Sequence, residues 1–270
     1  MNCLLCDEPM DAVLVKQGIA FHPTCDDQDG AEAAELKTLV QKMIRHADGN
    51  SARSLQRQIG PSEMGDACDR RIAYRLMETP EVNAAKDPWP AIVGTAVHHW
   101  MEGAVHTYQS AGIIDGWSTE IAVKPDDLIK GHSDVYDRKK QRVIDWKTAG
   151  TDVLRKIRAH GPPASYIYQA NLYGLGHERA GRPVKDIALV FLPRAGWLSG
   201  IYVWRDIYRR HLAERMIERV YRIGDRLLAG TKPWEISATP ADACGYCPWF
   251  ASGDTLMGIE PGANGCPGRN

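Results

Sequence analysis

The chain has 270 residues, of which 44% are hydrophobic and 25% are charged. This length can bury a large core as one domain, or as one domain with a small appendage. The formal net charge of −1 excludes a uniformly basic protein, so a DNA-binding surface would have to be a local basic patch. No apolar run is long enough to span a bilayer, and the first residues lack a signal-peptide pattern. We therefore expect a cytoplasmic protein without membrane contact.

Seven cysteines occur, mostly in C-x-x-C spacing, and their odd number favours metal ligation over disulfides in the absence of a secretion signal. Residues 1–30 contain two matched pairs of nitrogen and sulfur ligands: Cys3 with Cys6, and His22 with Cys25. Such pairs suit tetrahedral Zn²⁺, and a unit this small would depend on the metal for its folding free energy. We predict a zinc-binding unit with two short strands around Gly18. Nucleic-acid contact, protein docking and closure of the terminus are its alternative roles.

Residues 31–58 begin as an amphipathic helix that ends near Gly49, and we interpret this segment as a connector. Residues 59–77 predict a further helix that begins near Pro61 and carries Cys68. A single cysteine on an apolar helix is usually a buried packing residue. Residues 78–92 are rich in proline and predict a surface loop.

Residues 94–112 predict a helix on which His98 and Glu102, four residues apart, share one face. A neutral imidazole can complete the ligand set of Mn²⁺. An isolated histidine on a helix is usually not a ligand. A ligand role for His98 therefore requires further ligands from other segments of the chain.

Residues 131–149 predict a β-hairpin with a charged turn, preceded by a strand at residues 117–124. The hairpin carries Asp134, Asp145 and Lys147. Because the strand period is two, Asp145 and Lys147 project from one face while Trp146 points the other way. Two carboxylates can hold a hard divalent cation that activates water, and a lysine can stabilise a developing anion. This chemistry is metal-dependent phosphodiester hydrolysis. A surface hairpin with a salt bridge is the alternative.

The second half of the chain predicts a helix at 164–180, strands at 186–194 and 199–204, and a long helix at 206–229. Gln169 and Tyr173 lie on one face of the first of these helices. Basic residues at 150–163 are either a solvated helical turn or a phosphate-binding patch. The tail adds Cys244, Cys247 and Cys266.

Several of these segments resemble the motifs of the PD-(D/E)xK nuclease superfamily in its RecB-like branch. GHSD and VIDWKT are similar to the second and third motifs, GTAVH to G-x-x-x-H, and the Gln169–Tyr173 spacing to Q-x-x-x-Y. The segment around Cys68 resembles the cysteine motif of cluster-containing members, with Asp69 in place of a proline. The resemblance covers roughly residues 59–266, and the motifs occur in the family's order.

The resemblance implies an α/β fold with a central mixed sheet flanked by helices, to which the zinc-binding unit is added. The expected organisation is a zinc-binding unit at 1–30, a connector helix at 31–58 and a nuclease domain at 59–270.

The resemblance also implies roles for individual residues. Mg²⁺ or Mn²⁺ would be held by His98, Asp134, Asp145 and the carbonyl of Trp146. Lys147 would be catalytic. Three further residues complete the expected site: Glu102 as a ligand or its partner, Gln169 near metal and DNA, and Tyr173 in contact with the DNA strand.

In cluster-containing members, one cysteine before the catalytic core and three after it hold a [4Fe–4S] cluster. The corresponding residues here are Cys68, Cys244, Cys247 and Cys266. The eighteen residues between Cys247 and Cys266 depart from the short gap of the family. A Zn²⁺ ion held by four cysteines is the competing interpretation.

We therefore expect a metal-dependent DNA nuclease, an exonuclease rather than an endonuclease, that acts in DNA end processing, recombination or replication. A phage origin, and so the host cytoplasm, is compatible with the zinc-binding unit. The alternatives are a CRISPR spacer-trimming nuclease and a non-catalytic DNA-binding or docking protein. Expected partners are single-stranded DNA or duplex ends, a recombination or replication protein at the zinc-binding unit, and further copies of the chain.

Overall fold

A computed structural model describes residues 2, 8–18, 30–49, 59–83, 87–239, 242–251 and 265–268. The chain divides into two compact units, Met1–Gln56 and Arg57–Asn270, and each is described by itself. The expected zinc ligands Cys3, Cys6, His22 and Cys25 lie outside the described residues.

The first unit contains helices α1 (Ala12–Lys16) and α2 (Gly30–Gly49). We expected a strand where α1 lies, and this prediction was wrong. The carboxylate of Asp11 accepts a hydrogen bond from the main-chain N–H of Val13 at 2.6 Å. A side-chain cap of this kind stabilises a first helical turn, and it outweighs the β-propensity of the two valines. The end of α2 at Gly49 agrees with the sequence pattern.

The second unit is built on a five-stranded sheet in the order β1-β2-β3-β4-β5. Its strands are β1 (Trp117–Val123), β2 (Gly131–Asp137), β3 (Arg142–Ala149), β4 (Asp186–Pro193) and β5 (Tyr202–Ile207). Strands β3 and β4 pair in parallel and the other neighbours are antiparallel. The expected mixed sheet of an α/β fold is thus confirmed.

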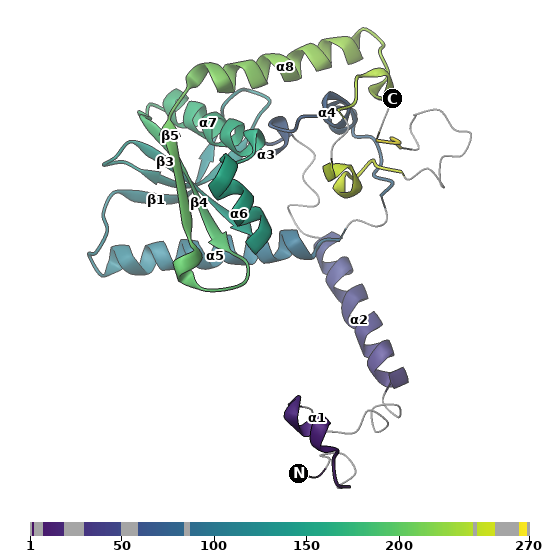
Figure 1. Ribbon diagram of the computed structural model, residues 1–270. Helices are drawn as coiled ribbons and strands as arrows, with labels where there is room; N and C mark the ends of the chain where they lie inside the picture. The colour runs from purple at the N-terminus through teal and green to yellow at the C-terminus, as the bar shows by residue number, and fades with distance from the viewer. Residues whose placement is uncertain are drawn as a thin grey trace. The chain divides into compact units, whose positions relative to one another are not determined.

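Helices cover both faces of this sheet (Figure 1). On one face, α5 (Trp89–Ser110) packs Val97, Met101 and Val105 against alternate residues of β2, β3 and β4. On the other face lie α6 (Thr151–His160) and α7 (Ala164–Arg179), packed on the opposite set of strand residues. Helix α8 (Arg210–Leu228) lies beside α7, as Figure 1 shows, and shares a second core with α3 (Pro61–Met64) and α4 (Asp69–Leu76).

Two helix boundaries differ from those expected. Helix α5 begins at Trp89 inside the expected loop. Asp87, which precedes the helix, accepts a hydrogen bond from the Trp89 N–H, and Pro90 favours the first helical turn. The expected single helix over 59–77 is divided into α3 and α4. Cys68 has an extended backbone at the start of α4, so it lies at the end of a helix and not in its apolar face.

Helix α7 can approach the sheet closely because it carries glycines on the packed side. A Cβ added to Gly176 would lie 2.8 Å from the Cβ of Val123 in β1 and 3.2 Å from the N atom of Lys124. This close approach places α7 against the end of β1, the strand that pairs with β2 of the hairpin.

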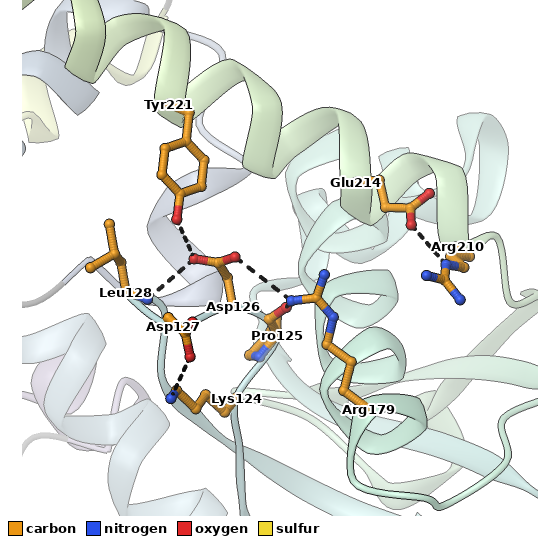
Figure 2. A network of polar contacts seen from close by, with 9 residues as sticks. All are labelled: Lys124, Pro125, Asp126, Asp127, Leu128, Arg179, Arg210, Glu214 and Tyr221. Carbon is orange, nitrogen blue, oxygen red and sulfur yellow. Dashed lines mark hydrogen bonds and ion pairs between the residues drawn. The ribbon is translucent and has the colours of Figure 1, made fainter.

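The loop between β1 and β2 is tied to both neighbouring helices (Figure 2). Asp126 accepts a hydrogen bond from the Tyr221 hydroxyl of α8 at 2.7 Å and lies 3.7 Å from the Arg179 guanidinium of α7. Arg179 also donates to the carbonyl of Pro125. These contacts fix the point at which β2 begins, and therefore the position of its side chains relative to α7.

Among the described residues, no helix has the length and apolar character that a membrane span requires.

Candidate active site

Strands β2 and β3 separate where the two hairpin aspartates lie. The register pairs of these strands are Val135 with Ile144, Tyr136 with Val143 and Asp137 with Arg142. Beyond them, the main-chain N–H of Trp146 donates instead to Oδ2 of Asp134, at 2.7 Å. At the fork, the point where β2 and β3 separate, a carboxylate thus replaces a main-chain acceptor. This hydrogen bond orients Asp134 and leaves its Oδ1 available for another partner.

Strand β1 brings a carboxylate to the same place through an irregularity in its backbone. Thr119 pairs with Val135 and Ile121 with Ser133, so Glu120 lies opposite Asp134 without a register partner of its own. Glu120 has a φ of 46°, in the left-handed region that non-glycine residues rarely adopt. Backbone strain of this kind clusters at functional sites.

Three side chains from three separate elements converge at the fork. One ligand atom each from His98 of α5, Glu120 of β1 and Asp134 of β2 lies within 4.8 Å of the other two. The Nδ1 atom of His98 is 3.2 Å from Oδ1 of Asp134. One imidazole and two carboxylates suit Mn²⁺, and Mg²⁺ accepts the carboxylate oxygens readily.

The electrostatics of this group favour a bound cation. Glu120 is exposed overall, but partial desolvation of its carboxylate raises its pKa, and the nearby charges of Asp134 and Glu102 raise it further. For His98, burial lowers the pKa, but the hydrogen bond with Asp134 and its negative charge outweigh this effect, so the pKa rises above its usual value. An excess of negative charge therefore surrounds the point that all three side chains approach. A divalent cation there would relieve it.

Asp145 and Lys147 lie on the same face of β3, as the strand period predicts. Asp145 is 1% exposed, and its Oδ2 atom lies 2.6 Å from Nζ of Lys147. Burial raises the pKa of Asp145 to about 6, although the charge of Lys147 acts in the opposite direction. Lys147 is thus the charged partner of this buried oxygen. A buried carboxylate in this position can also serve as an oxygen ligand of a divalent cation.

Helix α7 provides the other contacts of Lys147. The lysine Nζ donates to Oε1 of Gln169 at 2.9 Å, and Nε2 of Gln169 donates to the Tyr173 hydroxyl at 2.9 Å. Gln169 and Tyr173 are each 7% exposed. The structure thus places both residues in a hydrogen-bonded chain that begins at Lys147, and the contact of Tyr173 with a DNA strand stays a prediction.

Glu102 does not belong to the three-residue group. Its carboxylate oxygens lie 3.7 Å from Nδ1 of His99 and 3.9 Å from Nε2 of His106, both on its own helix. Glu120 lies in this group, and the sequence analysis did not single it out. The available signal was a glutamate in the strand that precedes GHSD, which an antiparallel pairing would bring beside Asp134. The role of Glu102 as a ligand or as the partner of one stays a prediction.

A second site contains the four cysteines that lie outside the N-terminal unit. Cys68, Cys244, Cys247 and Cys266 line one pocket together with Arg70 and Tyr74. Despite its distance along the chain, Cys266 is 8% exposed and accepts hydrogen bonds from Nη1 of Arg70 at 3.3 Å and the N–H of Gly268 at 3.4 Å. Donors to sulfur of this kind stabilise thiolate ligands.

No protein-family model and no curated protein matches the chain. Among solved structures, it is similar to the alkaline exonuclease of Laribacter hongkongensis, with 14% identity and a TM-score of 0.46 over 66% of this chain and 91% of that one. The structure of that exonuclease in complex with dAMP matches with 17% identity and a TM-score of 0.44, over 64% and 89% of the two chains.

A phage-related exonuclease from Haemophilus somnus 129PT has 13% identity and a TM-score of 0.38, over 51% of this chain and 73% of that one. At these identities and TM-scores the likeness is too remote to carry a conclusion about activity. The function has to be argued from the site.

Proposed function

We propose that this protein is a metal-dependent nuclease that hydrolyses phosphodiester bonds in DNA. The observation that carries the proposal is the convergence of His98, Glu120 and Asp134 beside the Asp145–Lys147 pair. These side chains come from three strands and one helix, so their meeting is a property of the fold and not of one local motif.

The contacts of each side chain indicate its role. His98, Glu120, Asp134 and Asp145 would hold Mg²⁺ or Mn²⁺, with the Trp146 carbonyl as a further oxygen donor. A bound ion supplies Lewis-acid polarisation of the phosphate and lowers the pKa of water. Lys147, held by Gln169, places a positive charge where negative charge develops on the phosphate oxygens. Asp134 is oriented by the Trp146 N–H and therefore presents one fixed oxygen to the site.

The more specific form of the proposal is an exonuclease of DNA ends, as the sequence resemblance implies. Linear single-stranded and duplex DNA, labelled at either end, would be incubated with Mg²⁺ or Mn²⁺, with a chelator as control. We expect shortening from one end of linear DNA, while circular DNA stays intact. Lys147→Ala is the matched inactive variant.

The outcomes of this assay separate the alternatives. Cleavage of circular DNA would identify an endonuclease. Trimming of overhangs to a fixed length would favour the CRISPR spacer-trimming alternative. Binding of DNA without cleavage under either metal would overturn the proposal in favour of a non-catalytic DNA-binding protein.

We also propose that the four-cysteine pocket holds a [4Fe–4S] cluster with a structural role. The pocket joins residues before the catalytic core to residues after it, so a cluster would link the two ends of this unit. Protein purified without oxygen should contain iron and sulfide, and Cys68→Ala should lose both. Zinc that is present without iron and is partly lost in Cys68→Ala would instead identify the competing single-ion site, because zinc held by the N-terminal unit would remain in that variant.

A further inference from the structure

The ammonium group of Lys147 is surrounded by partners of three chemical kinds. It lies 2.6 Å from the Asp145 carboxylate and donates to the Gln169 amide oxygen at 2.9 Å. Its Nζ atom also lies over the ring of Tyr166, 4.9 Å from the centroid. A cation at this distance over an aromatic face is attracted by the quadrupole of the ring.

The ring of Tyr166 is held in place independently of Lys147. Tyr166, Gln169 and Tyr173 are three and four residues apart along α7, so they form one stripe on the helix. The Tyr166 ring also packs at 6.3 Å and an interplanar angle of 36° against Phe191, which is fully buried. Phe191 is in turn the register partner of Lys147 across β3 and β4. The aromatic face is therefore a fixed surface on which the flexible lysine rests.

A cation in the site would change the attraction of the three partners for Lys147 to different extents. Asp145 would share its negative charge with the cation, and the cation would repel the ammonium group. Gln169 and Tyr166 are neutral, so their attraction for Lys147 does not compete with metal ligation. Because a lysine stem has many rotamers, one hydrogen bond leaves much of its freedom, and a second neutral contact restricts it further.

We propose that Tyr166 is a positioning residue for Lys147: the face of its ring keeps the ammonium group directed into the site when Asp145 is engaged elsewhere. The inference rests on the proposed nuclease function and deepens it. It assigns the effect to the ring face and not to the hydroxyl group.

Three variants test this inference. Tyr166→Phe keeps the ring face, and Tyr166→Leu removes it. Tyr202→Leu is the matched control, because Tyr202 packs on Phe191 from β5 at 6.2 Å, and the cation over its ring is Arg158, 5.9 Å from the centroid. Loss of the Tyr202 ring should disturb the packing around Phe191 as loss of the Tyr166 ring does, without changing the contacts of Lys147.

We expect Tyr166→Phe to retain kcat within about threefold of wild type, and Tyr166→Leu to lose kcat by roughly 10- to 100-fold with KM within about twofold. Tyr202→Leu should keep kcat. An equal loss of kcat in Tyr166→Leu and Tyr202→Leu would overturn the inference, since packing alone would then explain it. An equal loss in Tyr166→Phe and Tyr166→Leu would also overturn it, because the hydroxyl group would then be responsible.

A second readout does not depend on activity. In metal-free protein, labelling of Lys147 by an amine-acylating reagent, followed by mass spectrometry, should be faster in Tyr166→Leu than in Tyr166→Phe, Tyr202→Leu or wild type. Equal labelling rates in all four proteins would reject the contact. If the wild-type protein cleaves no DNA under Mg²⁺ or Mn²⁺, the proposed function fails, and the labelling rates still decide whether Tyr166 restrains Lys147.

Discussion

The Asp134 carboxylate accepts a hydrogen bond from the main-chain N–H of Trp146 at 2.7 Å, at the point where β2 and β3 separate. This contact gives Asp134 two tasks. One oxygen completes the hydrogen bonding of the hairpin, and the other lies 3.2 Å from His98 and faces the candidate metal site. Fold and chemistry therefore depend on the same side chain, and substitutions can separate them.

Asp134→Ala and Asp134→Asn should both abolish DNA cleavage, because neither supplies an anionic ligand. They should differ in stability. The alanine leaves the buried Trp146 N–H without its acceptor, which costs about 1–3 kcal/mol, whereas the asparagine oxygen can still accept. Urea denaturation of the two variants measures this difference. Cleavage at the wild-type rate by either variant would contradict the assignment of Asp134.

Glu120→Gln should weaken Mn²⁺ binding at least about tenfold, because a neutral amide is a much poorer ligand than a carboxylate. Glu102→Gln is the control, since Glu102 contacts His99 and His106 and is not in the three-residue group. Isothermal titration of metal into each variant measures both effects. A larger loss in Glu102→Gln than in Glu120→Gln would reverse the assignment of these two glutamates.

Glu120→Gly should stabilise the metal-free protein while it destroys the site. A left-handed backbone costs a non-glycine residue roughly 1–2 kcal/mol, and glycine removes this cost together with the repulsion from Asp134. Thermal unfolding in the presence of a chelator measures the gain. A lower melting temperature than wild type would show that the conformation of Glu120 is not strained.

Metal binding should weaken as the pH falls through about 6. Burial raises the pKa of Asp145 to about 6. The pKa of His98 is also raised, because the hydrogen bond and charge of Asp134 outweigh the lowering by burial. Both groups must lose their protons to bind a metal, so affinity should fall by up to about tenfold per pH unit for each proton displaced. Titrations over a pH series measure the slope.

Stability without metal should follow the opposite trend. The folded-state pKa values of Asp145 and His98 both lie above their ordinary values, so the folded state binds more protons than the unfolded state in the intervening pH range. The contribution of these groups is therefore present at low pH and is lost as pH rises through the folded pKa values. Unfolding with a chelator and with Mn²⁺ across the series should show opposite slopes.

The sequence predicts only part of this site, for reasons that individual residues illustrate. Strand alternation places Asp145 and Lys147 on one face, and helical spacing places Gln169 and Tyr173 on another. The position of Glu120 depends on the register of β1 against β2 and on a left-handed residue, which alternation does not encode. Asp11 and Asp87 each accept a hydrogen bond from a main-chain N–H two residues later, at the start of α1 and of α5. Such local hydrogen bonds can override average propensity, so α1 forms where a strand was expected and α5 begins earlier than expected.

Gly176→Ala should destabilise the second unit, because it forces α7 away from the strand that carries Glu120. The added Cβ would lie 2.8 Å from the Val123 Cβ and 3.2 Å from the Lys124 main-chain nitrogen, and neither atom can rotate away. Overpacking of this kind costs about 1–3 kcal/mol.

Gly224→Ala in α8 is the matched control for this substitution. It has no neighbour within 4 Å of the added Cβ and should stabilise the helix by about 0.5–1 kcal/mol, since alanine is the better helix former. Urea denaturation of both variants tests the pair. Equal stabilities would mean that α7 can withdraw from β1 without cost, and the placement of Gln169 behind Lys147 would then not depend on close packing at Gly176.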